Sequence, residues 1–383
     1  MKGILNMIKR LPNGHYKAAY SHGSGVNRVR RSKTFATRRE CDRWINEQQV
    51  ASGGGSEVRK RMLLTDYFDW FVRLEKGGNQ GLEPNTIDTY RVTNDHLKMV
   101  FSNVRLIDID RPMLQAGFNQ LGKRYSHATL TKDKCHLKSL FKIAVYNGDL
   151  KVNPMVDIKV GGTNKRVRTK ASKLMPESEF RKIQDFLRKY QYMSLIDVNR
   201  FVLFVISQTG IRVGEALGLQ EDDILIEKKQ LRINASWDSV HGTLKRSKTM
   251  AGYRQIPVSQ MCLEVIMAWR DTHNQALIAA GIDNPQKFLM LNKHNKVPLA
   301  KSINASYHQL QRKLNIEGGY STHTMRHEIA SLLVQKGLPL ASASRLLGHA
   351  NVGVTQAYYL DILPDKYQES DETIMKIISN DDD

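Results

Sequence analysis

The sequence predicts an α+β protein of several domains: a small three-stranded sheet with one helix, then a helical bundle, then a mainly helical domain with a small β-sheet. A chain of 383 residues is too long for one compact core. Strand-like alternation fills the first segment, whereas helical spacing dominates afterwards. ASGGGSE at 51–57 and KVGGTNKRVRTKASK at 159–173 have the composition of linkers. We therefore expect domains at residues 1–55, 60–157 and 174–383.

The first segment has the pattern of three strands joined by two hairpin turns. ILNMIKR and HYKAAYS flank a turn at Pro12-Asn13-Gly14, and a second turn, HGSG, leads into VNRVRRSKTFA. Thr37 then has the position of an N-cap for the helix RRECDRWINEQQV. Trp44 of that helix is expected to pack on the sheet.

The charge balance indicates a polyanionic partner. The formal net charge is +20 and the pI is about 9.8, and nucleic acid is the commonest large polyanion. The first segment is rich in cations and poor in acids, so we favour a sheet that reads a DNA groove over a merely solvated basic surface. The candidate DNA contacts in this segment are Lys17, Arg28, Arg30, Arg31 and Lys33.

The second segment predicts a bundle of four or five helices. Thr65 has the position of a cap before the apolar spacing of LLTDYFDWFVRLEK, and Pro84 begins the next helix. In HATLTKDKCHLKSLFKIAVYNGDL the leucines lie on one side and the lysines largely opposite. Lys132 and Lys138 on that basic side are further candidate DNA contacts, although such a face is as often only solvated.

The sequence gives little support for a membrane-spanning protein, a secreted protein or a cysteine-based metal site. No apolar run is long enough to span a bilayer, and the first residues lack an apolar core of signal-peptide length, so we expect no membrane partner and a cytoplasmic protein. Cys41, Cys135 and Cys262 are far apart and lack metal-site spacing, so we expect free thiols.

The third segment carries the candidate chemistry. In TGIRVGEALGL, Arg212 follows a glycine turn at the start of a short helix, where a guanidinium can face a phosphate, and Glu215 can orient it. A purely structural Arg-Glu pair would have the same pattern. Lys248 precedes Ala251-Gly252, which we interpret as a hairpin tip, and a lysine there can enter a DNA groove and give a proton to a leaving oxygen.

Two further motifs follow towards the C-terminus. In HTMRHEIASLLVQKG, His323 and Arg326 are three residues apart and can share a helix face. In LLGHANVGVTQAYYLDI, a glycine caps a helix just before His349, and a short helix then carries Tyr358 and Tyr359. Helical spacing by itself favours Tyr358 as a packing residue.

Together these motifs supply two arginines, a lysine, two histidines and a tyrosine without a set of metal-ligand spacing, so we expect no metal and no cofactor. This set fits phosphoryl transfer through a covalent phosphotyrosine. The tyrosine oxygen attacks phosphorus, the arginines stabilise the added charge, and a lysine and a histidine handle protons.

The ordered pattern TG-x-R-x-GE-x-L-x-L, lysine, H-x-x-R-H, LGH, tyrosine resembles that of the tyrosine recombinases, the phage and conjugative-transposon integrases. The resemblance makes Arg212 and Arg326 the phosphate clamp, Lys248 the general acid, His323 a proton-handling residue and His349 a phosphate hydrogen-bond donor. In that family the nucleophile usually lies nine residues after the LGH histidine, which gives Tyr358. Glu328 departs from the family, which commonly has a small hydroxyl residue there, and a carboxylate so close could pair with an arginine and restrain it.

The rest of the chain is also similar to these integrases. Residues 1–55 resemble their arm-binding domain, and the bundle resembles their core-binding domain. The resemblance implies double-stranded DNA with core and arm sites as substrate, a homotetramer that works through a Holliday junction, and an excisionase and a host DNA-bending protein as partners. A type IB topoisomerase, or a non-catalytic DNA-binding regulator on the same fold, is the alternative.

Overall fold

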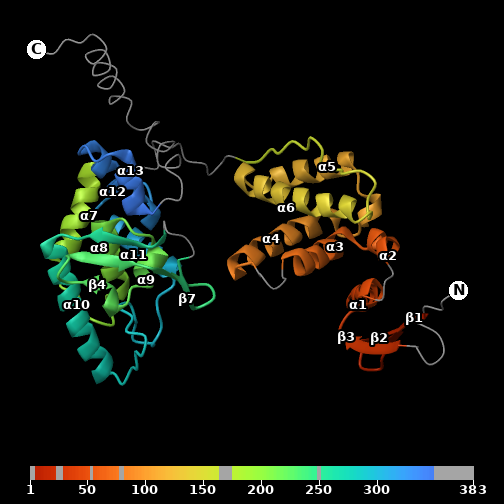
Figure 1. Cartoon of the computed structure of the whole chain (residues 1–383), viewed down its shortest axis with the longest axis horizontal. Helices are drawn as coiled ribbons and strands as arrows, with labels where there is room; N and C mark the ends of the chain where they lie inside the picture. Colours follow the sequence, from red (N-terminus) through yellow and green to blue (C-terminus); the bar gives the residue numbers. More distant parts are fainter. Residues whose placement is uncertain are drawn as a thin grey trace, which may run out of the picture. The chain divides into compact units, whose positions relative to one another are not determined.

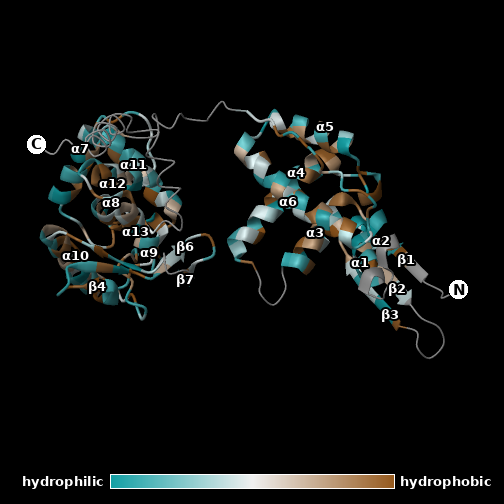
Figure 2. Cartoon of the chain, turned by 45° about the horizontal axis from the view of Figure 1, so that its top comes forward, coloured by the Kyte–Doolittle hydropathy of each residue, from teal (hydrophilic) through white to brown (hydrophobic). Residues whose placement is uncertain are grey.

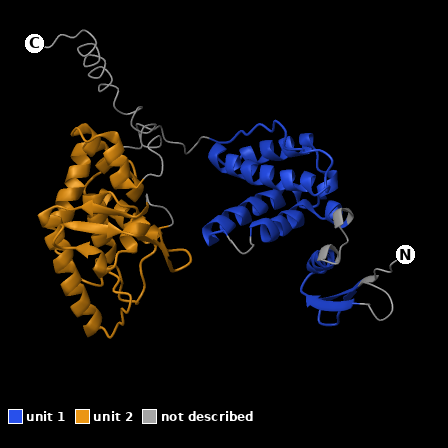
Figure 3. Cartoon of the chain, in the orientation of Figure 1, with its two compact units in different colours: residues 1–167 blue, residues 168–383 orange. Residues whose placement is uncertain are grey.

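The structure, a computed structural model, describes residues 5–22, 29–51, 55–76, 82–163, 175–247 and 252–348. The chain divides into two compact units, residues 1–167 and 168–383 (Figure 3). Within the described ranges, no helix is long and apolar enough to cross a bilayer. The described part also contains no group of three or more His, Cys, Asp or Glu side chains that could hold a metal ion.

The first unit begins with the expected small sheet (Figure 1). Strands β1 (Leu5–Arg10), β2 (Tyr16–His22) and β3 (Val29–Phe35) pair antiparallel in the order 1-2-3. Helix α1 (Arg38–Ala51) follows, and its Cys41 and Ile45 form a small core with Ala18 of β2. Thr37 caps α1 as predicted, because its Oγ accepts a hydrogen bond from Glu40 N at 3.3 Å while Glu40 accepts one from Thr37 N at 2.9 Å.

The rest of the first unit is the predicted helical bundle. Its elements are α2 (Gly55–Arg61), α3 (Leu64–Phe71) with a π-helical extension (Val72–Lys76), α4 (Pro84–Phe101), α5 (Arg111–Gly122) and α6 (His127–Tyr146). Its core is separate from that of the sheet and includes Phe68, Leu97 and Phe141. The prediction of Thr65 as a cap is wrong. Leu63 occupies the N-cap position of α3, and Thr65 is buried inside the helix.

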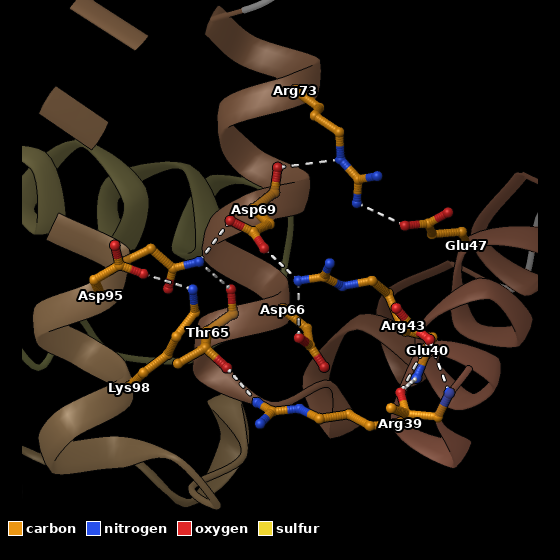
Figure 4. Close-up of polar contacts among 12 residues, drawn as sticks. Arg39, Glu40, Arg43, Glu47, Thr65, Asp66, Asp69, Arg73, Asp95 and Lys98 are labelled. Carbon is orange, nitrogen blue, oxygen red and sulfur yellow. Dashed lines mark hydrogen bonds and ion pairs between the residues drawn. The ribbon is translucent and has the colours of Figure 1, made fainter. Parts of the chain in front are cut away.

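A polar contact joins α1 to α3 within this unit (Figure 4). Arg39 donates to Thr65 Oγ at 3.1 Å, and Arg43 donates to Asp66 at 3.2 Å and also pairs with Asp69. Basic side chains of α1 are therefore partly neutralised by the bundle. The separate cores support a division of this unit into an arm domain and a helical domain, and that division stays a prediction.

The second unit is built around a buried helix. Seven helices are described: α7 (Glu177–Lys189), α8 (Val198–Thr209), α9 (Val213–Leu217), α10 (Gln260–Ala279), α11 (Ala300–Lys313), α12 (Thr322–Gln335) and α13 (Leu340–Leu347). From Phe201 to Ile206 every side chain of α8 is buried, which matches the continuous apolar run FVLFVI. In both units hydrophilic positions line the outer surfaces of the helices (Figure 2).

Two small antiparallel sheets complete the second unit and confirm the α+β fold class. Strands β4 (Ile224–Leu225), β5 (Gln230–Ile233) and β8 (Arg254–Pro257) pair in the order 4-5-8, and β6 (Ala235–Asp238) pairs with β7 (Thr243–Arg246). The predicted hairpin tip at Ala251-Gly252 stays a prediction, because residues 248–251 lie outside the described part of the chain. The β6–β7 hairpin turns at residues 239–242, and β8 pairs with β5 because its apolar Ile256 aligns with Leu231 in the core.

Candidate active site

Arg212 lies where the sequence places it, between two helices. Helix α8 ends at Gly210, whose φ of +68° is readily adopted by glycine, and Arg212 is the N-cap of α9. Glu215 orients it as predicted. The carboxylate accepts from Arg212 N at 2.8 Å and from Arg212 Nη1 at 2.9 Å. The Arg212 side chain is 42% exposed, so it remains accessible to a ligand.

A close approach fixes α9 against the β6–β7 hairpin. A Cβ atom added at Gly214 would lie 2.5 Å from Ser236 Oγ and 3.1 Å from Trp237 O, so the glycine after Arg212 permits this packing. The hairpin is pinned in turn because Asp238 pairs with Lys245 at 2.7 Å. The elements before Lys248 are therefore fixed relative to Arg212, while Lys248 itself lies outside the described residues.

Arg254 on β8 is a site residue that sequence reasoning missed. It binds Glu215 in a bidentate manner, with Nη2 2.8 Å from Oε2 and Nη1 3.1 Å from Oε1. Burial alone would raise the pKa of Glu215, but hydrogen bonds and charge from Arg254, and then from Arg212, hold that pKa below its ordinary value. The carboxylate stays ionised between the two guanidinium groups. The sequence offered one signal for Arg254, which is the single arginine in the strand-like stretch GYRQIPVS.

Arg326 is the most enclosed of the described arginines, with 1% of its surface exposed. It projects from α12, where Nη1 donates to Gly210 O at 2.9 Å and Nη2 donates to Leu347 O. The guanidinium therefore bridges the C-terminal ends of α8 and α13. Both ends carry carbonyls without partners in their own helix, which a cation stabilises.

His323 lies in the first turn of α12, one turn before Arg326. Its ring contacts His327 edge-on at 4.5 Å between centroids. Desolvation lowers the pKa of His323, and the charges of Arg326 and Arg212 lower it further, even though part of the residue is exposed. The structure thus brings Arg212, His323 and Arg326 into one electrostatic neighbourhood, with the imidazole favoured in its neutral form. His349 and Tyr358 lie outside the described residues.

In the part of the chain that the structure describes, Glu328 does not form the arginine pair that the sequence allowed. Among the described contacts, its Oε1 accepts a hydrogen bond from Met175 N at 2.7 Å. The carboxylate therefore satisfies a main-chain amide just before α7. Burial raises the pKa of Glu328 to about 7, the amide opposes that shift, and Glu177 adds to it.

The candidate DNA contacts of the sheet formed by β1, β2 and β3 divide between its two faces. Lys17 and Arg30 lie on the face opposite α1, whereas Arg31 and Lys33 align with Tyr20 and Ala18 on the face that α1 covers. Arg31 donates to Gln48 of α1 at 2.7 Å. A hollow of about 420 Å³ lies on the sheet, and its lining includes three of the candidate contacts. The lining residues are Met7, Lys17, Ala19, Tyr20, Ser21, Arg30, Arg31 and Ser32.

The remaining candidate DNA contacts are only partly placed. Lys132 and Lys138 are exposed on α6, as expected for a basic face. Lys134 of the same helix instead donates to Ile158 O and so has a structural role. Arg28 lies outside the described residues.

Comparison with known proteins agrees with this architecture. Residues 173–362 match the phage integrase family. The chain is 25% identical over 280 residues to a XerC-like tyrosine recombinase of Caldanaerobacter subterraneus subsp. tengcongensis, covering 68% of this chain and 69% of that protein. It is 23% identical over 334 residues to the integrase of Staphylococcus phage L54a, covering 82% and 92% respectively. The solved structure of the Tn1549 transposon integrase with a circular intermediate DNA has a similar fold, with a TM-score of 0.67 at 19% identity, covering 82% of this chain and 99% of that one.

Proposed function

Since the chain belongs to the phage integrase family and is a tyrosine-type site-specific DNA recombinase, we propose that it cuts and rejoins DNA through a covalent 3′-phosphotyrosine with Tyr358 as nucleophile. In cleavage the Tyr358 oxygen bonds to phosphorus and the bond from phosphorus to the 5′ oxygen breaks. The freed 5′ hydroxyl of a partner duplex then attacks the phosphotyrosine, which forms a Holliday junction and releases the tyrosine. A second round of the same steps resolves the junction, so that a mobile element is integrated or excised.

The observation that carries this proposal is the grouping of Arg212, His323 and Arg326 around the ends of α8 and α13. The exposed part of Arg212 can reach a non-bridging phosphate oxygen. Arg326 adds positive charge from a buried position, where the low dielectric strengthens its effect on a developing negative charge. Both arginines would thus stabilise the transition state more than the bound ground state.

Proton transfer would involve three further residues. The lowered pKa of His323 keeps its imidazole neutral near pH 7, so it can accept the proton that the tyrosine hydroxyl loses. Lys248 would give a proton to the departing 5′ oxygen, and His349 would donate a hydrogen bond to the phosphate. His349 follows Gly348, whose carbonyl accepts from Arg212 Nη2 at 3.0 Å, and this contact supports a place for it beside the arginines.

The proposed substrate is double-stranded DNA with two kinds of attachment site. The open face of the arm sheet, with Lys17 and Arg30, would bind arm sites, while the helical bundle and the second unit would each contact a core site. Two linked binding modules increase avidity through effective concentration. The active species would be a homotetramer on bacterial cytoplasmic DNA, assisted by an excisionase and a host DNA-bending protein.

The test separates binding from chemistry. Arg212→Ala should bind core-site DNA nearly as well as the native protein and should lose cleavage by roughly 10²- to 10³-fold, because Arg212 acts where charge develops. The matched control is Arg232→Ala. Arg232 lies on β5, which pairs with β8, and its Nε donates to Asp223 at 3.0 Å. Equal losses of binding and cleavage in Arg212→Ala would contradict the role proposed for it.

A further inference from the structure

The buried carboxylate of Glu215 is shared equally by two arginines. Oε2 accepts from Arg212 N and from Arg254 Nη2, both at 2.8 Å, and Oε1 accepts from Arg212 Nη1 at 2.9 Å and from Arg254 Nη1 at 3.1 Å. The side chains of Arg254 and Glu215 are 6% and 7% exposed. Arg254 is therefore too enclosed to act as a contact for DNA, and its effect must pass through its partners.

The third nitrogen of Arg254 holds the end of α13. Nε donates to Leu346 O at 2.7 Å. The next two carbonyls along the chain are held by the other arginines, Leu347 O by Arg326 and Gly348 O by Arg212. Three guanidinium groups from β8, α12 and the start of α9 thus bind three successive carbonyls at one helix end, where the helix dipole favours positive charge. The chain enters His349 directly from this point.

The charges give Arg254 a second effect. With Arg254 present, one carboxylate lies between two guanidinium groups and the set retains one net positive charge. Without it, Arg212 and Glu215 would form a neutral pair, and Arg212 would attract a phosphate less strongly at the same distance. Removing one partner of a buried ion pair also leaves the remaining charge poorly compensated.

We propose that Arg254 is a positioning residue for strand cleavage: through Glu215 it sets the orientation and free charge of Arg212, and through Leu346 it fixes the end of α13 beside the arginines. This role rests on the proposed function of Arg212. Arg254 itself touches neither the DNA nor the reacting atoms.

The experiment measures single-turnover cleavage of a nicked core-site substrate by the full chain, together with DNA affinity and thermal unfolding. Arg254→Gln should bind DNA within about threefold of the native protein, whereas its cleavage rate should fall on the order of 10- to 100-fold, as for a misplaced catalytic group. Arg232→Gln on β5, which likewise loses a carboxylate partner and a carbonyl partner, is the control and should cleave normally. Equal cleavage by the two variants would overturn the proposal.

A second substitution distinguishes charge balance from a merely structural role. In Arg254→Gln, the carboxylate of Glu215 has lost one guanidinium partner and restrains Arg212. Adding Glu215→Gln removes that charge, so the double variant should cleave about tenfold faster than Arg254→Gln. A double variant that is no faster than Arg254→Gln would refute the charge argument. Should Arg254→Gln fail to fold, Arg254→Lys takes its place, and normal cleavage by that variant would overturn the need for the bidentate contact.

Arg212→Ala in the same assay separates this proposal from the one it rests on. If Arg212→Ala cleaves normally, the proposed function of Arg212 fails and the role of Arg254 fails with it. If Arg212→Ala is inactive and Arg254→Gln cleaves normally, only the role of Arg254 is refuted.

Discussion

Glu328→Gln should stabilise the second unit at alkaline pH and leave it unchanged at acidic pH. The wild-type carboxyl has its pKa raised from 4.5 to about 7, chiefly by burial. A group whose pKa is raised on folding contributes stability below its unfolded pKa, and that contribution is lost as the pH rises from about 4.5 through about 7. The glutamine amide oxygen can still accept the hydrogen bond from Met175 N.

The expected size follows from the shift. The difference of 2.5 pKa units between 4.5 and about 7 corresponds to up to about 3.5 kcal/mol, at about 1.4 kcal/mol per unit. At about 2–4 °C per kcal/mol for a unit of this size, the variant should melt several degrees above the wild type at pH 8. At pH 4.5 the two should nearly coincide.

The assay is thermal unfolding, followed by circular dichroism, of both proteins between pH 4.5 and pH 8.5. Glu264→Gln on α10 is the control, because this exposed carboxylate contacts only Gln260 among the described hydrogen bonds, and it should leave the melting temperature unchanged at each pH. A gap between Glu328→Gln and wild type that is the same at every pH would refute the reasoning, since it would show that Glu328 does not titrate in this range.

Three other outcomes are expected. Lys17→Ala and Arg30→Ala should weaken arm-site binding and reduce its salt dependence, and no change in a titration at two salt concentrations would count against the open face as the interface. Arg43→Ala and Asp69→Ala should show a coupling of about 0.5–1 kcal/mol in a double-mutant cycle of urea unfolding, because both side chains are partly exposed; additive effects would disprove the α1–α3 contact. Burial lowers the pKa of His273 to about 4, so stability should fall as the pH drops from 6.5 towards 4. His273→Phe should remove most of that loss, and an unaltered acid-unfolding profile would contradict it.

Local signals in the sequence predicted most of the elements. Helices ended at Gly210 and Gly348 as expected, because glycine readily takes the left-handed conformation that closes a helix. The three strands and the Thr37 cap were also local patterns. Thr65 was wrongly assigned because a buried threonine and a capping threonine look alike in sequence, and only the packing of α3 distinguishes them.

The contacts between distant segments could not be predicted. Glu215 and Arg254 are far apart in sequence, and nothing local to either one names the other as its partner. The sequence did predict which residues of the β1–β2–β3 sheet share a face, because adjacent residues such as Arg30 and Arg31 point to opposite faces of a strand. Which face α1 covers depends on its packing against Ala18, and that is a tertiary property.

The most direct test of the central claim uses Tyr358→Phe and Tyr359→Phe beside the wild type. Each protein would be incubated with a nicked suicide substrate containing the core attachment site, and covalent protein–DNA complexes would be separated on a denaturing gel. The predicted result is a covalent band for the wild type and Tyr359→Phe and none for Tyr358→Phe. A band from Tyr358→Phe, or no band from the wild type on its own core site, would contradict cleavage through a Tyr358 phosphotyrosine.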